Sequence, residues 1–117
     1  NLQYGDTKDE LQDFEKNERI KIHAIQDIDL FNDFESIASL LKNLDLLISV
    51  SNSTAHVAAA LGVPTWIIKP KNHATFHYWN QPKNTTPWYP SVKLYSYFDG
   101  WKKTIEMVKN DLEKKFI

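Results

Sequence analysis

A run of polar side chains follows an apolar segment and leads into an alanine-rich one: Ser51, Asn52, Ser53, Thr54 and His56. If a helix begins here, its first turn offers unpaired backbone N–H groups and the positive end of the helix dipole. An anion can bind to such a helix start, and the hydroxyls of Ser53 and Thr54 can add donors. The same residue types also cap helices without binding anything. The spacing leaves open whether Ser51 or Ser53 is only a helix cap or the segment is an anion site.

His56 is the unusual member of this run, because it falls in the first turn or so of a helix made otherwise of Ala, Val and Leu. A lone histidine packed on a sheet is more often structural than catalytic. Near a helix amino terminus, however, its proton affinity falls, and a neutral imidazole can donate to or accept from a ligand. The type and position of His56 alone support a structural role and a ligand-binding role about equally. The neighbouring hydroxyls of Ser53 and Thr54 favour the pocket role.

The segment 69–90 has no helical or strand period and is rich in Asn, Pro, Thr and aromatic residues, which predicts a long functional loop. Trp79, Trp88 and Tyr89 in this loop either seal an edge of the core or form a stacking wall for a sugar or a base. For Trp88, which lies between two prolines, the core role is favoured.

Composition argues against several kinds of site. There is no cysteine, and three glycines cannot supply a glycine-rich phosphate loop. His73 and His77 are four residues apart, but no carboxylate occurs between Lys69 and Phe98, so we expect no metal site. A net charge of −1 with mixed signs argues against a nucleic-acid partner. No apolar run reaches membrane-spanning length and no signal segment is visible, so we expect a cytoplasmic protein without a membrane span.

Apolar periodicity predicts the elements that position these residues. Short runs predict strands at 2–4, 20–25, 46–50, 65–68 and 92–97. Four helices are predicted from apolar periodicity. The first begins at a capping box formed by Thr7 and Glu10, and the others begin near residues 32–33, near residue 54 and after residue 99. This alternation predicts an α/β fold, with a parallel sheet of about five strands and helices on both faces. The run 46–50 has little polar alternation, which predicts a central strand buried on both sides.

The segment from Leu44 to Pro64, LDLLISVSNSTAHVAAALGVP, resembles a signature of the tetratricopeptide-repeat-linked bacterial glycosyltransferase-like family. The carboxyl-terminal half of that family is also similar to the heptosyltransferases. Trp88-Tyr89-Pro90-Ser91 and the opening Leu2-Gln3-Tyr4-Gly5 match the same group. The resemblance therefore extends over nearly all of the chain.

The resemblance implies a GT-B fold, in which two Rossmann-like domains face each other across a cleft. This chain would be the carboxyl-terminal, donor-binding side, which holds a nucleotide-diphosphate sugar without a metal or any other cofactor. Ser53 and Thr54, with the helix start and the adjoining Ser51 and Asn52, would contact the diphosphate. His56 would line the same pocket.

The same resemblance sets expectations for the rest of the protein. Residues 1–117 would be a single partial domain of a longer chain, because the sequence opens on Asn1 within a predicted strand and lacks the domain's first strand. The acceptor domain and the tetratricopeptide repeats would be partners in the parent chain, and the fragment would be inactive alone. A sheet without its natural central strand would leave a strand edge unpaired, so we expect self-association through that edge.

Two departures from the family keep other functions open. Many relatives read Asp-Thr-Ser where this chain has Ser51-Asn52-Ser53, and Asp-Trp-Arg-Trp where it has Phe76-His77-Tyr78-Trp79. The first change removes a carboxylate near the sugar and favours, as an alternative, a catalytically degenerate domain that binds a glycan or a protein. A third alternative is an unrelated flavodoxin-like or receiver-type module, which the Trp-Tyr-Pro segment disfavours.

Overall fold

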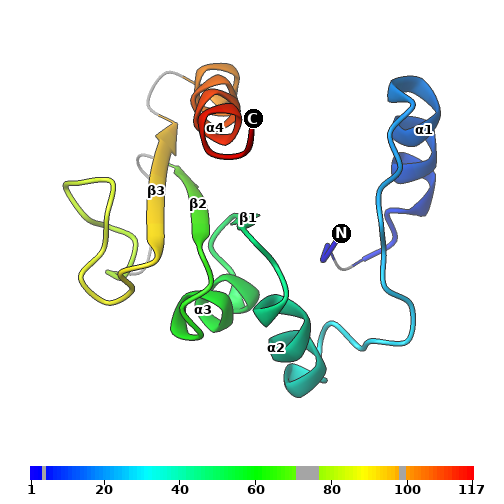
Figure 1. The fold of residues 1–117 in the computed structure, drawn as a ribbon, viewed down its shortest axis with the longest axis horizontal. Helices are drawn as coiled ribbons and strands as arrows, with labels where there is room; N and C mark the ends of the chain where they lie inside the picture. The colour runs from blue at the N-terminus through cyan, green and yellow to red at the C-terminus, as the bar shows by residue number, and fades with distance from the viewer. Residues whose placement is uncertain (4, 71–76, 98–99) are drawn as a thin grey trace. The chain divides into compact units, whose positions relative to one another are not determined.

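The computed structural model describes residues 1–3, 5–70, 77–97 and 100–117. These residues form two compact units, Asn1–Ser39 and Leu40–Ile117. Figure 1 shows the elements in chain order: α1 (Lys8–Glu18), α2 (Phe34–Lys42), β1 (Leu47–Ser49), α3 (Ser53–Ala60), β2 (Thr65–Pro70), β3 (Val92–Tyr97) and α4 (Trp101–Phe116). None of the helices in the described ranges has both the length and the apolar character that a membrane crossing requires.

The first unit contains α1 but none of the strands predicted for it. Residues 1–3 and 20–25 are not in a strand, while Tyr4 lies outside the described residues. The side chains of Ile20 and Ile25 are about half exposed, so this apolar run does not enter the core. The predicted capping box is also wrong, because Thr7 precedes α1 without a side-chain capping bond. A strand needs a partner strand to satisfy its backbone, and none of the described residues pairs with 20–25.

The predicted start of α2 is confirmed. The carboxylate of Asp33 accepts a hydrogen bond from the backbone N–H of Ser36 at 3.0 Å, which satisfies one of the unpaired donors of the first turn. Ile37 and Leu41, four residues apart on one stripe of the helix, are buried.

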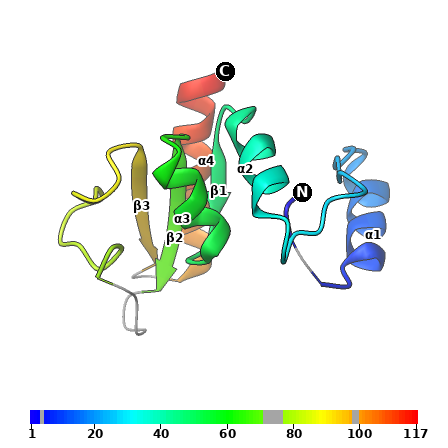
Figure 2. The same cartoon turned by 90° about the horizontal axis from the view of Figure 1, so that it is seen from below.

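The second unit is built on a parallel sheet with the strand order β1-β2-β3. The predicted parallel α/β architecture is confirmed, but three strands are present in the described residues instead of about five. Figure 2 shows α3 and α4 on opposite sides of the sheet. Both ends of β3 agree with the prediction from the sequence.

The position of β1 in the sheet differs from the prediction. It is an edge strand of the described sheet, and the central strand is β2. Leu47 is buried, but Ile48 is 40% exposed and the adjoining Val50 is 50% exposed. The prediction of a central strand is therefore wrong, since β1 pairs only with β2 among the described strands. The prediction of burial on both sides is wrong as well, since the side chain of Ile48 is exposed.

Alternate residues of β2 and β3 build a core on each face of the sheet. On the α3 face, Ile67 and Leu94 pack with Ala55, Ala59, Val92 and Trp79. On the α4 face, Trp66, Ile68 and Tyr95 pack with Val108. This alternation is the two-residue period of a strand, and it explains the consecutive apolar residues Trp66, Ile67 and Ile68 of β2, which serve both faces.

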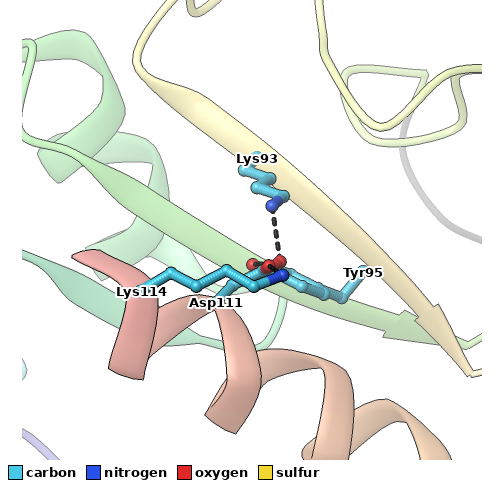
Figure 3. A network of polar contacts seen from close by, with 4 residues as sticks. All are labelled: Lys93, Tyr95, Asp111 and Lys114. Atoms are coloured by element: carbon cyan, nitrogen blue, oxygen red, sulfur yellow. Dashed lines mark hydrogen bonds and ion pairs between the residues drawn. The ribbon is translucent and has the colours of Figure 1, made fainter. Parts of the chain in front are cut away.

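Polar contacts hold α4 against β3 (Figure 3). Asp111 on α4 accepts hydrogen bonds from Lys93 Nζ at 2.6 Å and from the Tyr95 hydroxyl at 2.9 Å. These contacts lower the pKa of the Asp111 carboxyl, Lys93 contributing most. Burial and the bond to Asp111 raise the pKa of Tyr95, so its hydroxyl stays protonated and can donate.

Candidate functional site

The start of α3 lies directly after β1, at the carboxyl edge of the parallel sheet. Asn52 is the residue that caps it: its backbone is extended, and its side-chain oxygen accepts from the Ala55 N–H at 2.9 Å. The amide nitrogen of Asn52 donates to Ser49 Oγ at 3.1 Å. The alternative that Ser51 or Ser53 provides the cap is therefore wrong, since Asn52 is the residue whose oxygen reaches the free N–H.

The end of α3 is closed by a glycine, as the sequence predicts. Gly62 has a φ of 76° and donates to the Ala59 carbonyl at 3.1 Å, while Val63 donates to the Ala58 carbonyl at 3.0 Å. This pair of bonds satisfies carbonyls that the last helical turn leaves free. The helix is thus fixed at both ends, and its amino-terminal turn has a defined position at the sheet edge.

The two hydroxyls predicted to contact an anion belong to residues that are at least partly exposed at this turn. Ser53 is exposed and Thr54 partly exposed, and among the described residues none hydrogen-bonds to either hydroxyl. Ser51 differs, because its Oγ accepts a hydrogen bond from Trp79 Nε1 at 3.0 Å. Of the four hydroxyl or amide residues in the run, Ser51 and Asn52 are thus used in internal bonds.

His56 lies one turn into α3 and is half-buried. Its Nδ1 lies 3.1 Å from the Tyr89 hydroxyl, and either atom can be the donor, depending on the imidazole tautomer. The ring tilts over Trp79 with 4.4 Å between centroids and meets Tyr78 edge-on at 5.1 Å. Burial lowers the pKa of the His56 imidazole, which favours the neutral form.

Six rings gather at this point from α3 and the following loop, and we refer to them as the aromatic cluster: His56, His77, Tyr78, Trp79, Trp88 and Tyr89. The cluster grades from the core to the surface. Trp79 is fully buried and belongs to the core on the α3 face, so it packs beneath His56 and is not itself a ligand surface. Trp88 is 48% exposed and meets His77 and Tyr78 edge-on, so the core role favoured for Trp88 is wrong.

The loop that carries these rings is attached to the sheet by its backbone. Tyr89 accepts from the Val92 N–H at 3.0 Å, and Asn84 accepts from the Leu94 N–H at 2.8 Å along the outer edge of β3. Phe76 and His73 lie outside the described residues. Within the described part, no three His, Cys, Asp or Glu side chains gather closely enough to hold a metal ion.

This arrangement combines three kinds of ligand contact in one place. The first turn of α3 presents backbone N–H groups and two hydroxyls, which suit an anion. The imidazole of His56 can donate or accept a hydrogen bond, and the partly exposed Tyr78 and Trp88 offer ring faces for stacking. The part of this site that sequence reasoning missed is Tyr78 and the pairing of Ser51 with Trp79. No local signal in the sequence points to that pairing, since the two residues are 28 positions apart.

Comparison with known proteins found one similarity of note. No family model matches the chain. Over 114 residues the chain is 31% identical to protein FlbA of Caulobacter vibrioides, and the match covers 96% of this chain and 18% of FlbA. The chain thus spans less than a fifth of the length of this relative. No solved structure matches.

Proposed function

We propose that this chain binds the diphosphate of a nucleotide sugar at the start of α3, as the donor-binding part of a metal-independent glycosyltransferase. The observation that supports this proposal is the contact between His56 Nδ1, in the first turn of α3, and the hydroxyl of Tyr89, which lies 33 residues later in the sequence. The resemblance described above assigns donor binding to that turn. The aromatic cluster adds stacking surfaces beside it, as a nucleotide sugar requires in addition to an anion site.

In this proposal each group has one role. The backbone N–H groups and the hydroxyls of Ser53 and Thr54 bind the phosphate oxygens at the positive end of the helix dipole, so that no metal is needed to balance their charge. His56, kept neutral by its lowered pKa, donates to or accepts from the same ligand. Tyr78 and Trp88 stack against the sugar or the base.

We further propose that the second unit is the Rossmann-like core of a GT-B donor domain. The parallel sheet with a helix on each face supports this, as does the location of the site at the carboxyl edge of the strands. In the complete protein an acceptor domain would face this edge, and tetratricopeptide repeats would precede it. Transfer would require that acceptor side, so residues 1–117 would bind the donor without turning it over.

The second candidate is a catalytically degenerate domain that binds a glycan or a protein. The observation that favours it concerns Ser51 and Asn52, whose side chains are occupied by Trp79 and by the helix cap. In the family that the sequence resembles, an aspartate often stands in this stretch. A degenerate domain would use the exposed rings of the aromatic cluster and would show no sugar transfer or donor hydrolysis.

Calorimetric titration of the complete protein with a panel of nucleotide-diphosphate sugars tests the proposal. We expect binding of at least one donor, and loss of that binding in Thr54→Glu, because a carboxylate at the helix start repels the diphosphate. Thr85→Glu adds the same charge at an exposed loop position and should bind normally. Absence of binding by the natural protein, or equal binding by both variants, would contradict the proposal. Donor binding without release of sugar to any acceptor would favour the degenerate domain.

A further inference from the structure

Lys69 in β2 is a buried lysine whose place in the fold is not explained by packing. Only 7% of the residue is exposed, and in the parallel register it lies beside Ser96 of β3. Among the described residues, none forms a hydrogen bond or an ion pair with its ammonium group. A buried charge without a partner is costly, and an apolar side chain of similar length would avoid that cost. Burial accordingly lowers the pKa of Lys69.

Lys69 lines a groove of about 670 Å³ in the second unit. The groove lies between the loop 80–84, β3 and α4, and its size is that of a small-molecule site. None of the residues from Ser51 to His56 lines it, so it is separate from the start of α3.

The charge of this groove is strongly positive. Four lysines line it, namely Lys69, Lys83, Lys93 and Lys103, against one acid, Asp111. Asp111 already accepts from Lys93 at 2.6 Å and from the Tyr95 hydroxyl, as Figure 3 shows. Since the whole chain has a net charge of −1, this concentration of lysines does not reflect a basic protein. It marks a local preference for an anionic ligand.

Several of the other residues that line the groove are polar, and the loop 80–84 that contributes them is hydrogen-bonded to the sheet. Asn84 accepts from the Leu94 N–H at 2.8 Å, which holds the loop on the edge of β3. The side chain of Gln81 donates to the His77 carbonyl at 2.6 Å, which fixes the start of the loop. Asn80, Asn84 and Ser96 line the groove together with the lysines, and amide and hydroxyl groups of this kind can bond to the hydroxyls of a polar ligand.

We propose that the groove binds a small phosphate ester with a polar body, with the Lys69 ammonium as its direct phosphate ligand. A lysine is a compact point charge that suits a phosphate oxygen, and the ligand would supply a partner that Lys69 does not have among the described residues. The ligand would thus account for a buried lysine beside three others in the same groove. This inference does not rest on the proposed function of α3.

Titration of the complete protein with glucose 6-phosphate, with inorganic phosphate and with glucose as the uncharged control tests this. We expect glucose 6-phosphate to bind and its Kd to rise about tenfold or more in Lys69→Met, the usual scale for a lost charge-assisted hydrogen bond. Lys83→Met, at an exposed position of the groove, should weaken binding by a smaller factor. Lys102→Met, exposed and outside the groove, should leave it unchanged.

A second readout separates a ligand-binding lysine from a structural one. Removal of a buried charge that no described residue pairs with should leave the Tm of Lys69→Met equal to that of the natural protein or raise it. A lysine needed for folding would instead lower the Tm. The proposal is overturned if neither phosphate compound binds, or if Lys69→Met binds glucose 6-phosphate as tightly as the natural protein does.

The same variants keep the two proposed sites apart. Thr54→Glu should lose nucleotide-sugar binding and retain glucose 6-phosphate, and Lys69→Met should show the reverse. If Thr54→Glu abolishes the binding of glucose 6-phosphate, that ligand binds at the start of α3 and the groove proposal fails. If Lys69→Met alone abolishes nucleotide-sugar binding, the groove holds the donor and the proposed role of α3 fails.

Discussion

Trp79 Nε1 donates a hydrogen bond to Ser51 Oγ at 3.0 Å, and this bond joins the aromatic cluster to the start of α3. Trp79 is fully buried, so its indole N–H has no access to water if the acceptor is removed. The Ser51 hydroxyl thus adds a side-chain attachment for the loop to the backbone bonds that the loop forms with β3.

Removal of that hydroxyl should therefore destabilise the protein. We expect Ser51→Ala to lower the free energy of unfolding by about 1–3 kcal/mol, the cost of leaving a buried donor unsatisfied. Ser53→Ala removes an exposed hydroxyl from the same turn and should change stability by less than about 0.5 kcal/mol. Urea unfolding of the two variants makes the comparison. Equal stability of both variants would show that the Ser51–Trp79 bond contributes nothing.

Asn52 gives a second test at the same turn. Asn52→Ala should cost about 0.5–2 kcal/mol, because the Ala55 N–H loses its side-chain acceptor. Asn52→Asp retains an oxygen in that place and should remain close to the natural protein in stability. The same carboxylate should weaken nucleotide-sugar binding, since it lies where the diphosphate is proposed to bind. An Asn52→Ala variant as stable as the natural protein would count against Asn52 acting as an oxygen cap.

The pH dependence of stability should report on His56. Its pKa is lowered in the folded protein by burial, so between that lowered value and the usual value of 6.5 the unfolded chain binds more protons. Stability should consequently be unaffected by this group above about pH 6.5 and should fall as the pH decreases through the lowered pKa. His56→Gln should show a smaller loss of Tm between pH 7 and pH 5 than the natural protein. A steeper acid-induced loss in the variant would mean that His56 is instead stabilised in its charged form.

The outer edge of β1 should support self-association. Ile48 and Val50 are about half exposed beside an edge that pairs with no other described strand, and such an edge recruits strands from other chains. We expect residues 1–117 to form dimers or larger species in sedimentation experiments and Ile48→Lys to shift them toward the monomer. Ile105→Lys, at an equally exposed position on α4, serves as the control and should not. A monomer across a wide concentration range for the natural chain would contradict this prediction.

The local pattern of apolar and turn residues was sufficient to predict most of the helices and strands of the second unit. The bounds of β3 and the extent of α3 followed from apolar runs bordered by turn residues, and Gly62 marked the helix end because it adopts a positive φ. The predicted strand at 20–25 failed because an apolar run becomes a strand only when another strand satisfies its backbone. Pairing of that kind is not encoded in the run itself.

The site was less accessible to sequence reasoning. Ser51, Asn52 and Ser53 all carry a side-chain oxygen suited to a cap, and only backbone geometry selects Asn52 among them. The aromatic cluster joins α3 to rings about 20 to 30 residues later, through contacts that no local period encodes. The sequence does contain one local sign of a second site, the charged residue Lys69 within the mostly apolar strand Thr65–Pro70, which was not among the predicted site residues.

Amide chemical shifts of the complete protein, followed during addition of a nucleotide-diphosphate sugar, test the central claim most directly. If the donor binds at the start of α3, the largest changes should occur at Ser53 and Thr54, whose N–H groups are proposed to face the diphosphate. Smaller changes should occur at Ala55 and His56, whose N–H groups bond to Asn52. Amides in the middle of α4, such as Val108, should shift little. Saturating donor that leaves the α3 amides unchanged, or that shifts only residues around Lys69 and α4, would contradict the account.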